Sequence, residues 1–181
     1  PGVSFPIQPT NLVFDYGPGA SATTPFRGLS NHGPFNSERF ACNDLHILAL
    51  CRLTNRGAMS QFAKLLVDGI PESPYFKRGM KSLFRLKSVT VTIKEVKSAL
   101  PEAYEEAVDE AIRDAKDNEF DLALVDCPSA SKRSPIRTSP YYRSRVRLMS
   151  YGIPTQGIRE EHLRFTSKEL QSTLGPIALQ I

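Results

Sequence analysis

The short apolar run His46–Cys51 limits the folds open to this chain more than any other feature. A strand with one exposed face alternates apolar and polar residues, whereas a strand buried on both faces is apolar throughout. This run therefore predicts a strand buried on both faces, in a sheet that is covered on two sides. Phe120–Asp126, in which Asp121 and Asp126 flank an apolar stretch, predicts a further strand. The β-branched run Ser88–Ile93 predicts a third strand, and Gly152–Ile158 predicts a fourth, short strand or turn.

Segments with helical periodicity lie between these runs. Apolar residues recur at helical spacing from Met59 to Val67, and Pro101 begins a helix that extends to Ala115, with carboxylates in its first turns. Ser167 predicts the cap of a helix that reaches Leu174, and a further helix begins at Pro176. Strands that alternate with helices predict an α/β fold with a mostly parallel, four-stranded sheet and helices on both faces.

The length of 181 residues suffices for one well-cored domain with an extension. Residues 1–40 are rich in Pro, Gly, Ser and Asn, which predicts a lead-in segment packed on the core, with Asn11–Asp15 as a short strand. Residues 41–181 form the predicted domain. The start at Pro1 and the end at Ile181 suggest a fragment of a larger protein.

Hydropathy and cysteine usage favour a cytoplasmic protein without a membrane partner. No apolar run approaches the roughly 18–20 residues that span a bilayer, and no secretory signal opens the chain. Cys42, Cys51 and Cys127 are far apart and lack CxxC spacing, so the sequence supports neither a zinc site nor a disulfide framework. Reduced thiols are the expected state.

The net charge of +4 is unevenly distributed. The segment 129–150 contains six Lys and Arg residues and no acidic residue, whereas 102–121 contains nine Asp and Glu residues. A local basic patch predicts a polyanionic partner held at one place, but both runs are also compatible with solvated faces.

The basic segment contains a well-defined helix start. Ser139 is a good N-cap and Pro140 suits the first helical position, so a helix follows. Tyr141 and Arg145 are four residues apart and share one helix face. An aromatic ring and a guanidinium beside a helix N-terminus suit a terminal nucleotide, with the ring on the base and the cation on the phosphate. The loop before this helix follows a predicted strand, and ligands of parallel sheets bind beyond the carboxyl ends of strands.

The order of these motifs resembles the MID domain of prokaryotic Argonaute proteins. The resemblance rests on Tyr141 with Arg145, then Gly152–Gln156, then Ile177–Ile181, preceded by Asn11–Phe14 and Pro25–Leu29. It covers roughly residue 9 to the end. It implies a Rossmann-like sheet that anchors the 5′ end of a guide strand.

The resemblance assigns roles to individual residues. Tyr141 would stack on the first base, while Arg145 and Gln156 would hold the 5′-phosphate; Arg145 stands where the family usually has Lys. Thr155 would offer a hydroxyl or backbone N–H to the phosphate. Gln180 would reach a phosphate inside the guide, although Pro176 stands where the family usually has Asn. Lys132, Arg133 and Arg137 lie in the loop that would face the first base, whereas Arg143 and Arg147 are expected to be surface charges.

The implied partners are a short guide RNA or DNA with a 5′-phosphate and a downstream PIWI domain of the same protein. The chain itself is expected to be a binding module for guide-directed silencing or defence rather than an enzyme, because the slicing site belongs to the PIWI domain. No cofactor is expected in this segment, and a Mg²⁺ ion at the 5′-phosphate is a further expectation for the intact protein.

Each residue assignment has a structural alternative. Tyr141 could pack on the sheet, Arg145 could pair with an acidic side chain, and Gln156 could hydrogen-bond to the backbone of a turn.

The alternative function is a Rossmann-like nucleotide phosphotransferase or hydrolase that uses Asp126, Glu161 or His162. The chain contains neither GxGxxG nor GxxxxGK[ST], which such an enzyme would favour. Asp126 has no partner acid at a spacing that suggests a metal site.

Overall fold

The computed structural model describes residues 10–35, 44–73, 76–115, 120–128 and 136–163. Its centre is a four-stranded sheet in the order β4-β3-β5-β6, and every neighbouring pair is parallel. The strands are β3 (Asp44–Arg52), β4 (Ser88–Val96), β5 (Leu122–Cys127) and β6 (Thr155–Arg159). The predicted α/β fold with a parallel four-stranded sheet is therefore confirmed.

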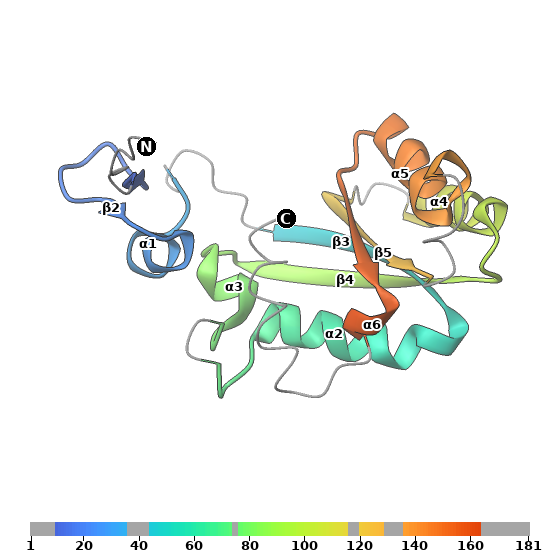
Figure 1. Cartoon of the computed structure of the whole chain (residues 1–181), viewed down its shortest axis with the longest axis horizontal. Helices are drawn as coiled ribbons and strands as arrows, with labels where there is room; N and C mark the ends of the chain where they lie inside the picture. Colours follow the sequence, from blue (N-terminus) through green and yellow to red (C-terminus); the bar gives the residue numbers. More distant parts are fainter. Residues whose placement is uncertain (1–9, 36–43, 74–75, 116–119, 129–135, 164–181) are drawn as a thin grey trace, which may run out of the picture.

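Helices cover both faces of the sheet (Figure 1). One face carries α2 (Arg56–Asp68), α3 (Gly79–Leu83) and α6 (Glu160–Leu163). The other face carries α4 (Pro101–Ala115) and α5 (Pro140–Ser150). A 3₁₀ turn, η1 (Leu53–Asn55), joins β3 to α2, and a second, η3 (Ile136–Thr138), precedes α5.

Alternation along the strands divides the core into two clusters, because successive side chains of a strand point to opposite faces. Ile47, Leu122, Leu124 and Ile158 pack with α2, α3 and α6. Leu48, Leu50, Ala123 and Val125 pack with α4 and α5. Ile47–Cys51 of β3 and Leu122–Val125 of β5 are buried, which explains why these parts of the two central strands are apolar.

The segment before the sheet contains more structure than its composition suggests. Strands β1 (Leu12–Val13) and β2 (Ser21–Ala22) form an antiparallel pair, and α1 (Pro25–His32) follows, capped by Thr24. Phe26 and Leu29 of α1 pack against the cluster on the α2 face. The sequence did not lead us to expect this helix. The predicted boundary near residue 40, and the helices predicted at 167–174 and from Pro176, lie outside the described residues.

Candidate nucleic-acid interface

The start of α5 has the predicted capping geometry. Ser139 is in an extended conformation, and its Oγ accepts a hydrogen bond from the Tyr142 N–H at an N···O distance of 3.2 Å. The Arg143 N–H donates to the Ser139 carbonyl at 3.1 Å. Ser139 therefore already binds two backbone donors of the first turn. Fewer backbone N–H groups are therefore free to bind an anion at this helix end than the sequence led us to expect. Side chains would have to supply more of the contacts with such an anion.

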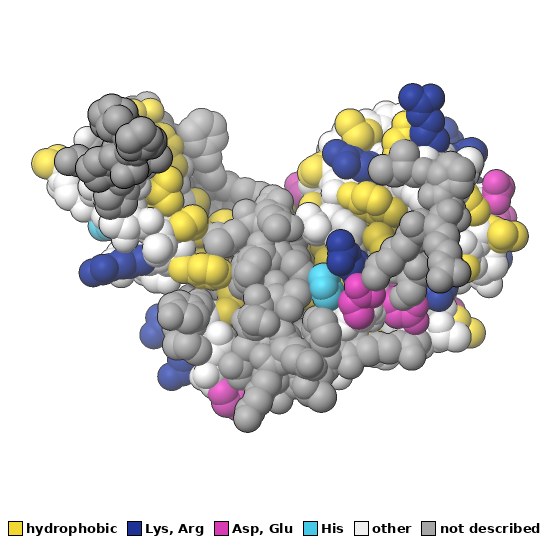
Figure 2. Space-filling view, viewed as in Figure 1, with side chains coloured by type: hydrophobic (Ala, Val, Ile, Leu, Met, Phe, Trp, Pro, Cys, Tyr) yellow, Lys and Arg dark blue, Asp and Glu magenta, His cyan; other side chains and the backbone are white. Residues whose placement is uncertain are grey.

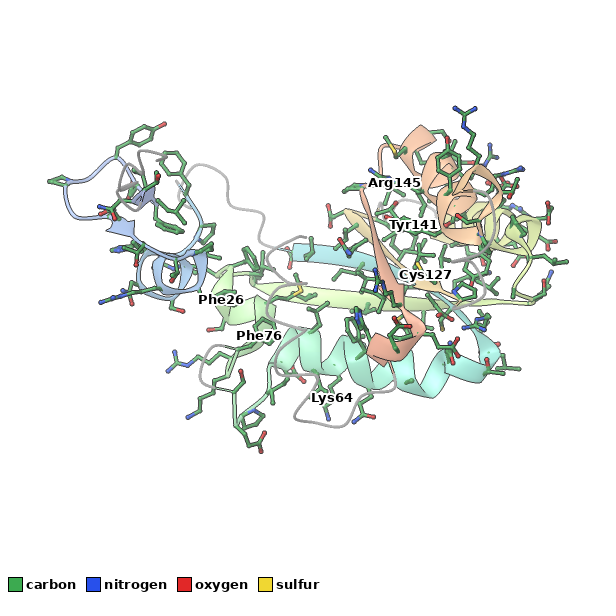
Figure 3. The ribbon with its side chains drawn as sticks, in the orientation of Figure 1. Phe26, Lys64, Phe76, Cys127, Tyr141 and Arg145 are labelled. Carbon is green, nitrogen blue, oxygen red and sulfur yellow. The ribbon has the colours of Figure 1, made fainter. Side chains whose placement is uncertain are left out.

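Tyr141 lies between α5 and the edge strand β6. Its hydroxyl makes a long, weak contact with the Thr155 carbonyl at 3.5 Å. Its ring lies over Gly157, since a Cβ at that position would come within 2.9 Å of Tyr141 Cε2 and 3.0 Å of Cys127 Sγ. The ring is half-buried and contacts the cluster on the α4/α5 face. It is thus held in place on one side while part of its surface stays accessible. Figure 3 shows Tyr141 and Arg145 on α5 and Cys127 below them at the end of β5.

The three arginines of α5 differ in their partners. Arg143 makes a bidentate pair with Glu105 at 2.7 and 2.8 Å, and Arg147 makes one with Asp109 at 2.6 and 3.0 Å. Arg147 lowers the pKa of the Asp109 carboxyl below its usual value. Arg145 is exposed and has no acidic partner among the described residues. The acidic helix α4 therefore neutralises two of the three cations and leaves Arg145 available to a ligand.

Thr155 and Gln156 begin β6, but their side chains belong to different faces. Gln156 is paired in register with Leu124, whose side chain lies on the α2 face, whereas Gly157 is paired with Val125 on the α4/α5 face. The Gln156 amide donates to the Gly157 carbonyl at 3.1 Å, and the Thr155 hydroxyl donates to the Ile153 carbonyl at 3.4 Å. The structure thus brings Tyr141 next to Thr155 and Gly157 and turns Gln156 to the other side of an edge strand.

The remaining predicted contacts are only partly described. Arg137 lies in η3, two residues before the Ser139 cap, and it is exposed. Lys132, Arg133 and Gln180 lie outside the described residues.

Asp126 is fully buried at the end of β5 and is held by a network of partners. Its carboxylate accepts hydrogen bonds from Arg52 Nε at 3.1 Å and from Asn55 Nδ2 at 2.9 Å. Arg52 also pairs with Glu160 at 3.1 Å. Tyr104 donates to the Asp126 carbonyl at 2.9 Å, and burial raises the pKa of its phenol well above the usual value. A carboxylate with this many partners links β3, β5 and α6 rather than serving as a general base.

No part of the described chain forms a metal site, since it contains no group of three or more His, Cys, Asp or Glu side chains that could hold an ion. Cys51 and Cys127 are free thiols, and burial is the main cause that raises their pKa values to about 11 and about 12. No helix within the described ranges is both long and apolar enough to cross a membrane.

Comparisons with known proteins agree with this architecture. No family model matches the chain. The chain is 30% identical over 167 residues to the protein argonaute of Cereibacter sphaeroides (strain ATCC 17025 / ATH 2.4.3), which covers 90% of this chain and 22% of that protein. Its fold matches a chain in a structure of Clostridium butyricum Argonaute bound to a guide DNA and a 19-mer target DNA. That match has a TM-score of 0.51 and 13% identity, and it covers 88% of this chain and 21% of the other. The chain therefore spans about a fifth of the length of these Argonautes, and its resemblance to part of an Argonaute protein is confirmed.

Proposed function

We propose that this chain, which resembles one segment of Argonaute proteins over nine tenths of its length, binds nucleic acid and anchors the 5′-phosphorylated end of a short guide strand. The observation that carries the proposal is the pairing pattern on α5. Arg145 lies one turn after Tyr141 and has no acidic partner in the described parts of the chain, while both neighbouring arginines are neutralised. The parent protein would use the guide in silencing or defence.

In this proposal Tyr141 supports the first base. Its ring is already positioned by Gly157 and Cys127, so little conformational freedom is lost when a base stacks on it. Arg145 approaches the 5′-phosphate from the same helix, and its guanidinium fork matches two phosphate oxygens.

Gln156 would complete the phosphate contact from the other face of β6. Gln156 is half-buried at the start of β6, an edge strand of the described sheet. Among the described residues its amide donates to the carbonyl of the next residue, a contact that it can exchange for a phosphate oxygen. Supporting contacts come from four further residues. Thr155 would contact the 5′-phosphate, Arg137 and Lys132 would lie near the first base, and Gln180 would contact a phosphate inside the guide. In the intact protein a Mg²⁺ ion would bind at the 5′-phosphate as a further part of this proposal.

The alternative of a nucleotide phosphotransferase or hydrolase finds less support. Its strongest candidate base, Asp126, is fully buried and bonded to Arg52 and Asn55. An assay of mononucleotide turnover separates the two functions, because steady release of product would favour the enzyme.

The direct test compares short oligonucleotides with a 5′-phosphate and with a 5′-hydroxyl. Arg145→Ala should weaken binding of the phosphorylated strand by roughly 10- to 150-fold, the equivalent of about 1.5–3 kcal/mol for a charge-assisted hydrogen bond. Binding of the hydroxyl strand should change little. Arg147→Ala is the matched control, since it removes an arginine of the same helix that is already paired with Asp109. Equal losses for both strands in Arg145→Ala would contradict the phosphate assignment.

A further inference from the structure

A second group of cations lies far from α5. The segment from Phe76 to Lys87 contains five Lys and Arg residues and no acidic residue. These residues are Lys77, Arg78, Lys81, Arg85 and Lys87, and all five are exposed. Figure 2 shows dark-blue side chains at the left of the molecule, where Figure 1 places α1 and α3, at the end of the sheet away from α5.

These cations differ from the arginines of α5 in their partners. None of the five forms an ion pair with an acidic side chain within the described ranges. Like charges that are close together and unpaired repel one another and create a local positive potential. Such a potential raises the local concentration of an anionic partner.

A cavity of about 220 Å³ lies beside two of these cations and is lined by residues of α1, of α3 and of the segment before α3. Lys77 and Arg78 line it together with the hydroxyl-bearing Ser30 and Ser82. Ammonium, guanidinium and hydroxyl groups are the side-chain donors that phosphate oxygens accept from. A water molecule occupies roughly 30 Å³ in the liquid, so the cavity has room for a phosphate group and its hydration.

Arg85, which follows α3, lies against the end of α1. Its side chain lies against the C-terminal end of α1, since a Cβ at Gly33 would come within 2.4 Å of Arg85 Nε. Arg85 also has φ of 54°, a conformation that residues with a Cβ rarely adopt. Strained residues of this kind persist where the surrounding structure holds them and they cluster at binding sites. Phe26 of α1 and Phe76 belong to the same apolar cluster below, which supports the junction (Figure 3).

We propose that Lys77, Arg78 and Lys81, with Ser30 and Ser82, form a second nucleic-acid contact, which we call the α1–α3 surface. It binds phosphates of a single-stranded backbone without reading sequence. A lipid surface fits less well, because the apolar side chains that line the cavity, Phe76 and Leu83, are buried and cannot insert into a bilayer. The contact is independent of the 5′-phosphate and goes beyond the proposed function of α5.

The test uses the full chain and a short oligonucleotide with a 5′-hydroxyl, so that no terminal phosphate is needed. The variant K77E/R78E should bind it on the order of 10-fold more weakly, and the slope of log affinity against log salt should fall by about 1.4, the value for two lost contacts to a single strand. The control K64E/R113E makes the same change in net charge at exposed positions on α2 and α4, outside the α1–α3 surface. It should retain most of the affinity and the slope.

Further measurements separate the sources of phosphate and the two proposals. K77E/R78E should keep its preference for a 5′-phosphorylated strand over a 5′-hydroxyl strand. This preference tests the assignment of α5 and does not depend on the α1–α3 surface. Inorganic phosphate and a mononucleotide should compete poorly, because a backbone contact depends on several phosphates. Full competition by either would show a site for free phosphate and overturn the proposal. Unchanged affinity of K77E/R78E, equal losses in the control, or a larger loss of binding to phosphatidylserine vesicles than to the oligonucleotide would also overturn it.

A second variant distinguishes a loss of binding from a loss of folding. Ser82→Asp places a negative charge at the cavity and leaves every cation in place, and Ser82 is exposed. It should also weaken binding of the 5′-hydroxyl strand, with a circular dichroism spectrum and Tm close to those of the unmodified chain. Normal binding by a folded Ser82→Asp would contradict the phosphate contact at this cavity.

Discussion

The ring of Tyr141 lies over Gly157 so closely that a single added methyl group would collide with it. A Cβ at residue 157 would approach Tyr141 Cε2 to 2.9 Å and Cys127 Sγ to 3.0 Å. The position of the proposed stacking platform thus depends on a residue without a side chain on the neighbouring strand.

Gly157→Ala should displace the Tyr141 ring and destabilise the fold by about 1–3 kcal/mol, as overpacking usually does. For a chain of this size, Tm should fall by roughly 2–4 °C per kcal/mol. Binding of a 5′-phosphorylated strand should weaken as well. Gly57→Ala is the matched control, because Gly57 lies in α2 with nothing within 4 Å of the added Cβ. There Ala should raise stability by about 0.5–1 kcal/mol. Equal effects at both positions would show that the contact with Tyr141 is unimportant.

Charge and shape at residue 145 can be separated with two substitutions. Arg145→Lys keeps the positive charge but lacks the bidentate fork, whereas Arg145→Gln removes the charge. We expect the Lys variant to retain most of the preference for a 5′-phosphate over a 5′-hydroxyl, and the Gln variant to lose it. Fluorescence anisotropy with the two strands measures both. A Gln variant that still discriminates would mean that the phosphate is held elsewhere.

Asp126→Asn should be one of the most destabilising polar substitutions in the chain. It removes the charge that faces the Arg52 guanidinium and retains the shape of the side chain. Breaking a buried pair from one side typically costs about 3–5 kcal/mol, and the partial exposure of Arg52 places the expected loss at the lower end of that range. Urea unfolding measures the change.

The exposed pair of Arg147 and Asp109 provides the comparison for Asp126→Asn. Asp109→Asn should change stability by about 1 kcal/mol or less, as is usual for surface pairs. The folded-state pKa of Asp109 is lowered, so its contribution is present above the unfolded pKa and is lost as pH falls through the folded value. The difference in the free energy of unfolding between wild type and Asp109→Asn should therefore vanish in acid.

If Asp126→Asn lowered the free energy of unfolding only slightly at neutral pH, the structural role of Asp126 would be contradicted.

Cys127 should resist alkylation in the folded chain. Burial raises its thiol pKa to about 12, so very little thiolate is present at mildly alkaline pH. Iodoacetamide followed by peptide mass mapping should label Cys127 slowly in buffer and rapidly in urea. Rapid labelling without denaturant would show that the end of β5 beneath Tyr141 opens readily.

Part of the sheet could be predicted because its two central strands are largely buried on both faces. His46–Cys51 lies within β3 and Phe120–Asp126 overlaps β5, and the apolar residues of both segments follow from this burial. The helix predicted from Pro101 begins at that residue and is helical to Ala115, the last described residue of this segment. Helix α1 was missed because Gly28 and the flanking Pro and Gly residues suggested loop. Gly28 is needed there, since a Cβ would collide with Phe14.

The candidate site was harder to predict because it depends on contacts between distant elements. The sequence placed Tyr141 and Arg145 on one helix, but it could not show that Glu105 and Asp109 neutralise Arg143 and Arg147. The face on which Gln156 lies follows only from the pairing of β6 with β5. The cations from Lys77 to Lys87 stand in the sequence, yet only the structure shows that Lys77 and Arg78 line a cavity together with Ser30 of α1.

The network of Arg52, Asp126 and Glu160 has an evolutionary consequence. Two carboxylates share one guanidinium, so the three positions are constrained as a set rather than singly. A homologue that replaced the arginine alone would take the cation away from the fully buried Asp126 and from Glu160 at once. We therefore expect positions 52 and 126 to covary in related sequences, with loss of the cation accompanied by a neutral residue at the buried acidic position.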